Sequence, residues 1–156
     1  MNILFIGGTG LISSACSALA VEKGHNLTIL NRAKSSNYSP PEKARLLTAD
    51  IHSEEATLVN LLAPFQFDVV VDWIAFTPAD IERDIRLFSG KTGHFVFISS
   101  ASAYQKPPEH YLITEETPLS NPFWQYSRDK IAIEERLMAE YHRQGFPITI
   151  IRPSLT

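Results

Sequence analysis

The sequence predicts an α/β fold in which a doubly wound parallel sheet of about six strands is flanked by helices. Two observations carry this prediction. Six short apolar runs alternate with longer segments of helical pattern, and each run is unbroken, as in strands buried on both faces. The first run is followed at once by the glycine-rich turn Gly7-Gly8-Thr9-Gly10. Because crossovers in parallel sheets are right-handed, the strand order 3-2-1-4-5-6 of a Rossmann fold is expected.

The first strand and the first helix are expected over residues 2–6 and 10–23. The strand is a short apolar run, NILFI, that ends at a glycine. The helix carries an apolar stripe at helical spacing, and Gly24 is expected to end it. The stripe consists of Leu11, Ala15, Leu19 and Val21.

Two more strands and a second helix follow. An apolar run predicts the second strand at residues 27–30, and a weaker run predicts the third at residues 44–48. Between them, residues 33–43 are rich in Ser, Pro, Asn and Lys and are expected to form an exposed loop. A helix is expected over residues 53–62, with Ser53 as its N-cap.

The middle of the chain predicts a strand, a helix and another strand. The run DVVVDW at residues 68–73 is the fourth strand, and HFVFIS at residues 94–99 is the fifth. The helix between them is expected over residues 78–88, with Thr77 as its cap and a proline at its first position.

A long helix over residues 123–143 and a sixth strand over residues 147–151 are the last two elements. The segment before this helix, residues 105–123, is rich in proline and long for a connection. Long connections often belong to active sites, so this segment is expected to lie near one.

Composition limits the classes of protein that the chain can represent. With 156 residues, 44% of them hydrophobic and 20% charged, it is expected to form one domain over residues 1–156. A formal net charge of -3 disfavours a broad basic surface for nucleic acid. No apolar run is long enough to span a bilayer, so no membrane partner is expected.

Cysteine and histidine usage argues against disulfide and metal chemistry. Cys16 is the single cysteine, so no internal disulfide can form and a reducing compartment is favoured. The chain also begins directly in a strand, without the regions of a signal peptide, and a cytoplasmic location is therefore expected. The five histidines are scattered without metal-ligand spacing, so no metal site is expected.

The glycine-rich turn has the chemistry of a phosphate-binding site. Gly7 and Gly10 allow the backbone to turn tightly from strand to helix and to approach a pyrophosphate closely. The helix that follows would present free N–H groups and a partial positive charge to the phosphates. Ser13 stands where the usual fingerprint has its third glycine. The alternative is an ordinary strand-to-helix turn, but the position after the first strand favours a dinucleotide site.

The end of the second predicted strand bears on which dinucleotide would bind. In the dinucleotide fold a carboxylate there accepts from the ribose hydroxyls, whereas a 2′-phosphate needs a positive side chain. Here the strand ends in Asn31 and Arg32, with Lys34 nearby and no carboxylate. Asn31 can bond a hydroxyl and Arg32 can pair with a phosphate, which favours NADP, with NAD as the alternative cofactor. The competing interpretation treats Arg32 as an ordinary exposed loop residue.

Two residues after the third predicted strand suit the adenine base. Asp50 can accept a hydrogen bond from the exocyclic amine, and Ile51 can pack on the ring. They are therefore added to the predicted cofactor site.

A candidate catalytic group follows the fifth predicted strand. Tyr126 and Lys130 lie four residues apart on a predicted helix and therefore on one face. A free phenol has a pKa of about 10, and a neighbouring ammonium lowers that value. Tyr126 could then take a proton from a substrate hydroxyl while a nicotinamide cofactor receives hydride from the same carbon. Lys130 would also bond the nicotinamide ribose, and Ser100 would orient the substrate oxygen.

The competing interpretation of this group is an ordinary amphipathic helix, because a tyrosine and a lysine at this spacing are common. The pair Ser99-Ser100 at the end of the preceding strand favours the catalytic interpretation. Ligand sites in such sheets lie outside the carboxyl ends of the strands, which is where this pair is expected.

In combination, these motifs resemble those of the extended short-chain dehydrogenase/reductase superfamily, and within it the NAD-dependent epimerase/dehydratase family. The resemblance runs nearly the length of the chain. It rests on FIGGTGLIS (5–13), LNR (30–32), AD (49–50), FISSASAY (97–104), YSRDK (126–130) and IIRPS (150–154).

The resemblance implies further site residues. In the family the catalytic Ser or Thr stands four residues before a tyrosine that follows the fifth strand, which maps to Ser100, with Tyr104 as the reference. Tyr126 and Lys130 would contact the cofactor as well as act on the substrate. The implied cofactor site also includes Leu11, Ile12, Ile74, Ala75, Phe76 and Pro153.

The resemblance also implies a function. Family members act by hydride transfer at a hydroxyl or keto carbon of nucleotide-sugar-like small molecules, commonly as homodimers. Members that dehydrate sugars carry Asp-Glu where Ala101-Ser102 stand here, which disfavours dehydration. Members usually continue well beyond the Arg-Pro motif at residues 152–153 into a substrate lobe, so the chain is expected to be the N-terminal, nucleotide-binding portion without that lobe.

One subgroup that the chain resembles includes chloroplast stem-loop RNA-binding-like proteins. The segments FISSASAYQKP (97–107) and NPFWQYSRDK (121–130) carry this likeness. The alternative function is therefore a non-catalytic NADP(H)-binding or RNA-binding Rossmann protein, although the acidic composition makes nucleic acid the less favoured partner.

Overall fold

The computed structural model describes residues 1–34 and 38–154, so residues 35–37 of the expected loop and residues 155–156 lie outside it. The strands are β1 (Asn2–Ile6), β2 (Asn26–Asn31), β3 (Arg45–Thr48), β4 (Phe67–Asp72), β5 (Thr92–Ile98) and β6 (Ile148–Ile151). The helices are α1 (Leu11–Glu22), α2 (Glu55–Leu62), α3 (Pro78–Phe88) and α4 (Gln125–Gln144), with a 3-10 turn, η1, at Ala101–Ala103. The six strands form one sheet in the order β3-β2-β1-β4-β5-β6 with parallel neighbours, which confirms the predicted topology.

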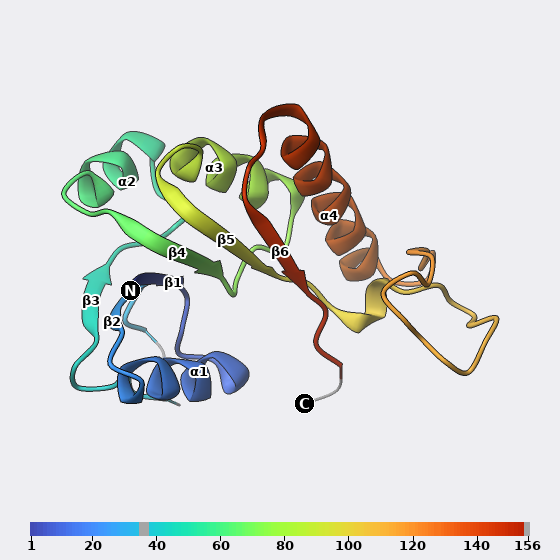
Figure 1. Ribbon diagram of the computed structural model, residues 1–156, viewed down its shortest axis with the longest axis horizontal. Coiled ribbons are helices and arrows are strands. Elements are labelled where there is room, and N and C mark those ends of the chain that lie inside the picture. The colour runs from blue at the N-terminus through green and yellow to red at the C-terminus, as the bar shows by residue number, and fades with distance from the viewer. Residues whose placement is uncertain (35–37, 155–156) are drawn as a thin grey trace.

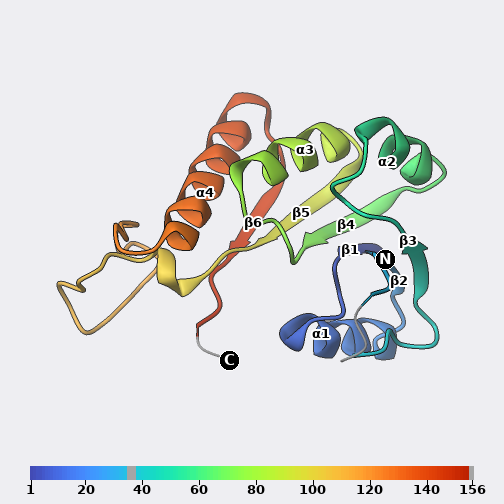
Figure 2. The same ribbon diagram turned by 180° about the vertical axis from the view of Figure 1, so that it is seen from behind.

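Helices cover the two faces of the sheet unequally. α2, α3 and α4 lie on one face, and α1 lies on the other (Figure 1, Figure 2). Leu4 and Ile6 of β1 join the larger core beneath the three helices, whereas Ile3 and Phe5 join a smaller core beneath α1. The central strands are thus buried on both faces, which explains their unbroken apolar sequences.

The start of α3 follows the prediction, and the start of α2 does not. Thr77 and Asp80 form a reciprocal capping box at α3, with proline at the first helical position. The prediction of Ser53 as the N-cap of α2 is wrong, because α2 begins at Glu55 and its cap residue is Glu54. The Ser53 N–H instead bonds to Asp50 O at 3.0 Å, which places Ser53 in the preceding turn.

The predicted buried face of α1 is wrong. Leu11 and Leu19 are 62% and 49% exposed, and of the predicted stripe only Val21 packs against the core beneath α1. The turn before the helix lies against the sheet, because a Cβ on Gly8 would come within 3.2 Å of the Ile29 side chain. So close an approach leaves room only for small side chains. The helix accordingly buries Ser13, Ser17 and Ala20.

The carboxyl ends of the parallel strands meet at one edge of the sheet, and this edge positions the candidate site. Gly7 follows β1 there, Asn31 ends β2 and Asp72 ends β4. Beyond the same edge, residues 105–123 extend away from the sheet as a long loop (Figure 1). An antiparallel bridge between Tyr104 and Leu119 joins the two ends of this loop.

Within residues 1–34 and 38–154, no helix is both long and apolar enough to cross a membrane.

We expect Ser17→Leu to lower the free energy of unfolding by about 1–3 kcal/mol, because the larger side chain must push α1 away from the turn. Ser17 is 0% exposed and its hydroxyl donates to Gly8 O at 2.8 Å. Leu19→Ala, on the exposed side of the same helix, is the control and should change this free energy by less than about 0.5 kcal/mol. Urea unfolding followed by circular dichroism measures both. Equal effects of the two substitutions would contradict the face assigned to α1.

Candidate functional site

A cleft of about 240 Å³ lies at the carboxyl ends of β1 to β4. Part of the predicted cofactor site lines it: Gly7, Asn31, Arg32, Asp50, Ile51, Ile74 and Phe76. Residues outside the predicted set also line it: Thr9, Leu30, Ala33, Lys34, Ala49 and His52. The remaining predicted residues are not among its lining residues: Gly10, Leu11, Ile12, Ala75, Tyr126, Lys130 and Pro153.

The glycine-rich turn leaves space for a ligand at the end of β1. Gly7 has a φ of +99°, and a Cβ there would lie 3.1 Å from the Ile74 side chain and 3.2 Å from that of Trp73. A side chain at position 7 would therefore strain the backbone and crowd the wall of the cleft. The turn offers its backbone to the cleft, as a pyrophosphate site requires.

Ser13 replaces the third glycine of the fingerprint without disturbing the start of α1. Its hydroxyl accepts from the Gly10 N–H at 2.8 Å, and the side chain is buried. Leu11 and Ile12 form the first helical residues, whose N–H groups have no partner within the helix. These two residues do not line the cleft, although free N–H groups at a helix start are the kind of group that binds anions.

Charged groups meet at the far end of the cleft. Arg32 Nη1 lies 3.8 Å from Asp50 Oδ2, and both side chains are about half exposed. The His52 N–H donates to Asp50 Oδ1 at 3.0 Å and lowers the pKa of Asp50, with the Arg32 charge as a weaker cause. A carboxylate and a guanidinium are therefore both available to a bound nucleotide.

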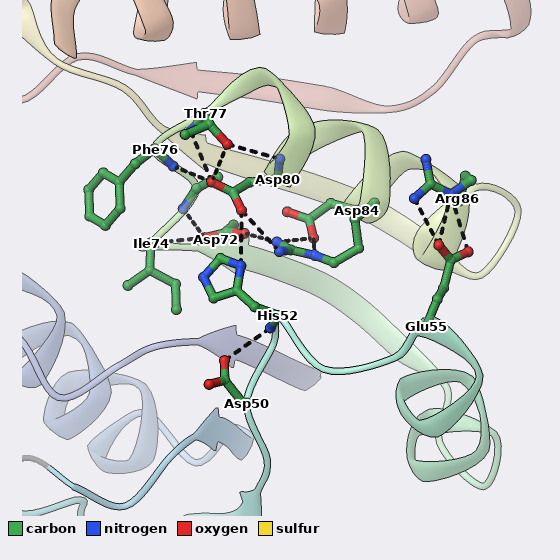
Figure 3. A network of polar contacts seen from close by, with 12 residues as sticks. Asp50, His52, Glu55, Asp72, Ile74, Phe76, Thr77, Asp80, Asp84 and Arg86 are labelled. Atoms are coloured by element: carbon green, nitrogen blue, oxygen red, sulfur yellow. Dashed lines mark hydrogen bonds and ion pairs between the residues drawn. The ribbon is translucent and has the colours of Figure 1, made fainter. Parts of the chain in front are cut away.

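His52 is the functional candidate that sequence reasoning missed. It lines the cleft, and its Nδ1 lies 3.3 Å from Asp80 Oδ1 of α3 (Figure 3). Its spacing from Asp50, which forms a turn with the His52 backbone, is the only local signal that the sequence offers.

Lys130 is the most buried member of the predicted catalytic group. It is 1% exposed, and its Nζ donates to Ala75 O at 2.7 Å and to Ile98 O at 2.8 Å. Burial lowers the pKa of Lys130 to about 8, against the opposing charges of Asp72, Asp80 and Glu134. The ammonium thus ties α4 to the ends of β4 and β5.

Aromatic rings surround this ammonium. Lys130 Nζ lies 4.6 Å from the centroid of the Phe97 ring, 5.1 Å from that of Phe76 and 5.6 Å from that of Tyr126. The centroids of the Tyr126 and Phe76 rings are 6.3 Å apart. Because Phe76 also lines the cleft, the ring of Tyr126, in the first turn of α4, lies near the wall of the cleft.

Ser100 is linked to α4 through a chain of hydroxyl groups. Ser100 Oγ donates to Ser102 Oγ at 2.9 Å, and Ser127 Oγ donates to the same oxygen at 2.9 Å. Asn121 Nδ2 donates to Ser102 O at 2.8 Å. The structure therefore brings Ser100, Tyr126 and Lys130 to the same edge of the sheet, with Ser102 as the link between the strand end and the helix.

A partly buried ion pair between Glu134 and Arg152, absent from the predicted site, supports this edge. Glu134 accepts from the Ser99 hydroxyl and, at 2.6 Å, from Arg152 Nη2. Arg152 Nη1 donates to the hydroxyl of Tyr104 at 3.1 Å. Pro153 lies beside this pair, where its carbonyl accepts from the Ala101 N–H at 2.9 Å. These contacts fix the turn that carries Ser100.

The sequence profile of the NAD dependent epimerase/dehydratase family matches residues 3–156. The chain belongs to this family. The family expected from the motifs is thus confirmed, and so is the fold that it implied.

Curated relatives include the UDP-glucose 4-epimerases of Lactobacillus helveticus and Corynebacterium glutamicum, which are 27% and 26% identical to the chain. Each match covers 97% of the chain, and 51% and 50% of the respective relatives. The chain thus spans about half the length of these relatives.

A solved structure of similar fold is the UDP-glucose 4-epimerase of Bifidobacterium longum in complex with NAD+ and UDP. It superposes with a TM-score of 0.81 at 19% identity, over 97% of this chain and 52% of that one. At this identity the likeness shows that the chain has the same fold as that part of the epimerase, and nothing further.

The lowered pKa of Lys130 predicts a pH-dependent stability. Between about 8 and 10.5 the unfolded chain holds the Lys130 proton more tightly than the folded chain, so wild-type stability rises with pH relative to Lys130→Met. The gain should reach about 3 kcal/mol at most. Urea unfolding of both proteins across this pH range measures it. The exposed substitution Lys91→Met is the control and should show no such trend; a flat difference for Lys130→Met would contradict the shift.

Proposed function

We propose that the chain is the nucleotide-binding portion of an NAD(P)-dependent oxidoreductase or epimerase. It would act by hydride transfer at a hydroxyl or keto carbon of a nucleotide-sugar-like substrate. The observation that carries the proposal is the buried Lys130 ammonium beneath Tyr126, beside a cleft that begins at the glycine-rich turn. The names of the curated relatives, both UDP-glucose 4-epimerases, support this substrate class.

The residues of the cleft fit a dinucleotide. The turn at Gly7 admits no Cβ without contact at 3.1 Å, which is the property of a backbone cradle for a pyrophosphate. The first turn of α1 would supply N–H groups to the same phosphates. Asp50 and Ile51 would hold the adenine, and Lys130 would bond the nicotinamide ribose. The bound cofactor would supply the hydride acceptor and donor.

The catalytic steps that this chain would supply are a proton transfer and an orientation of the substrate. Tyr126 would take the proton of the substrate hydroxyl, with the Lys130 ammonium, 5.6 Å from the centroid of its ring, as the neighbouring positive charge. Ser100 would bond the same substrate oxygen, and its hydroxyl now donates to Ser102. The Ser100 hydroxyl would in that case donate to the substrate oxygen instead of to Ser102 Oγ, which would keep the hydrogen bond from Ser127.

The proposed cofactor is NADP rather than NAD. Arg32 is a partly exposed guanidinium at the end of β2, within the cleft, where a 2′-phosphate would lie. Its 3.8 Å contact with Asp50 is long enough to be exchanged for a bidentate contact with a phosphate.

We expect Arg32→Ala to weaken NADPH binding about tenfold or more, because a charge-assisted contact to phosphate is lost. NADH binding should change little. Fluorescence titration of the 156-residue chain with each cofactor measures both dissociation constants. The matched control is Arg45→Ala, because Arg45 is an exposed arginine at the start of β3 and does not line the cleft. Tighter binding of NADH than of NADPH by the wild type would overturn the proposed preference.

In a form of the protein that also carries the substrate lobe, we expect Tyr126→Phe to reduce turnover of a UDP-sugar by roughly 10²–10⁴-fold, since the proton acceptor is removed. The dissociation constant of NADPH should stay unchanged, because the ring remains in place. Tyr141→Phe, an exposed tyrosine on the same helix, is the control. Retained turnover in Tyr126→Phe would reject the assigned role. Tight cofactor binding without turnover in a wild-type form that carries the substrate lobe would instead favour the non-catalytic alternative.

A further inference from the structure

Two aspartates hold four consecutive backbone N–H groups of the segment Ile74–Thr77. Asp72 Oδ1 accepts from the first two groups at 2.6 and 2.8 Å. Asp80 Oδ2 accepts from the last two at 3.0 and 2.9 Å. Figure 3 shows both carboxylates directed at this segment, which connects β4 to α3. The path of the segment is therefore set by carboxylates rather than by regular secondary structure.

Arg83 connects these carboxylates to a third one, Asp84. Its guanidinium donates to Asp84 Oδ1 from Nε at 2.9 Å and from Nη2 at 2.8 Å, and to Asp80 Oδ1 from Nη1 at 3.2 Å. Nη2 also lies 3.7 Å from Asp72 Oδ2. All four side chains are buried. A single guanidinium thus lies within 3.7 Å of three carboxyl groups.

Two oxygens in this cluster lack a hydrogen-bond partner among the residues that the structure describes. They are Asp72 Oδ2 and Asp84 Oδ2, and both residues are 0% exposed. A buried polar atom without a partner is costly. Two ionised carboxylates can only accept hydrogen bonds, whereas a proton on either one turns it into the missing donor.

We propose that Asp72 and Asp84 share a single proton, and that this pair is a positioning device which holds the Ile74–Thr77 segment against the cleft. The proton lies between the two Oδ2 atoms and satisfies both. Asp72 Oδ1 keeps its backbone donors, and Asp84 Oδ1 keeps the two donors of Arg83.

The titration of the cluster agrees with this arrangement. Burial raises the pKa of Asp84 well above its usual value, and the charge of Asp72 and a hydrogen bond with it raise it further, against the opposing charge of Arg83. Burial alone would also raise the pKa of Asp80, but hydrogen bonds from the Thr77 and Phe76 N–H groups outweigh it and lower the pKa. The other charged or titratable groups that face this cluster are Arg83 of α3, Lys130 of α4 and His52 from the segment after β3.

Through this segment the pair reaches two parts of the site. Ile74 and Phe76 line the cleft, and Ala75 O accepts one of the hydrogen bonds of Lys130. If the segment shifts, the wall of the cleft and the position of the ammonium shift with it. The effect on the reaction rests on the proposed function, whereas the shared proton rests on the geometry of the cluster alone.

Asparagine substitutions test the shared proton by hydrogen-bond satisfaction. Asp84→Asn and Asp72→Asn each place an amide donor where the proton would lie, so each single variant should keep the stability and the NADPH dissociation constant of the wild type at neutral pH. The double variant sets two donors against each other, and should weaken NADPH binding about tenfold and unfold at a lower temperature. A double variant that equals the single variants would overturn the proposal.

Infrared spectroscopy of the chain without cofactor detects the proton directly. The wild type at neutral pH should show the carbonyl stretch of one protonated, buried carboxyl group, and Asp84→Asn should lack it. Asp68→Asn, an exposed aspartate at the start of β4, is the control and should keep the band. A wild-type spectrum without this band would overturn the proposal, whatever the outcome of the cofactor and turnover assays.

The pH dependence of stability is a further test, because a purely structural role of Asp84 would not make the stability difference from Asp84→Asn depend on pH. Because the folded-state pKa of Asp84 is raised, the wild type should lose stability relative to Asp84→Asn as pH rises above the usual carboxyl range. Thermal unfolding of both proteins from acid to neutral pH measures this difference, and a difference that does not change with pH would count against the shared proton.

Discussion

The candidate site depends on one buried cation. The Lys130 ammonium connects Ala75 O, which follows β4, to Ile98 O at the end of β5, so a single side chain of α4 fixes the helix across two strand ends. Burying an ammonium is unfavourable unless its donors are paired and opposite charges lie near it. Both conditions are met here, and the nearest opposite charges belong to Asp72, Asp80 and Glu134. The carboxylates around the site are therefore part of the condition under which Lys130 can stay charged while buried.

Each of these carboxylates is held by a different part of the fold. Glu134 is held by Arg152 and the Ser99 hydroxyl, at the ends of β6 and β5. Asp80 is held by backbone N–H groups at the start of α3, which lower its pKa, whereas burial beside Asp72 raises the pKa of Asp84. Chemically identical groups one helical turn apart are thus driven in opposite directions by their surroundings. The segment before α3 stays in place because Asp72 and Asp80 both accept hydrogen bonds from its backbone N–H groups.

The sequence predicts the sheet well because every strand is a separate apolar run, and it predicts the start of α3 because Thr77, Pro78 and Asp80 act locally. It fails at α1, where the contact between Ser17 and the Gly8 carbonyl depends on how closely two distant segments approach. The motifs single out Gly7 by its place in the turn after β1, and Tyr126 and Lys130 by their spacing along α4. Spacing cannot reveal that Asp72 and Asp84 would meet, or that Glu134 would bind Arg152, because these partners come from different elements.

Counted without His52, which faces Asp80, the charges of the site balance if the aspartate pair holds one proton. Asp72 and Asp80 then supply two negative charges, and Arg83 and Lys130 supply two positive ones, while Glu134 and Arg152 neutralise each other. Loss of the shared proton would leave an uncompensated negative charge among groups that are all buried or nearly so, in a region of low dielectric constant where such an excess is costly. Under the proposed function, the proton shared by Asp72 and Asp84 would thus keep the positive charge of Lys130 available to Tyr126, whose ring centroid lies 5.6 Å from Lys130 Nζ.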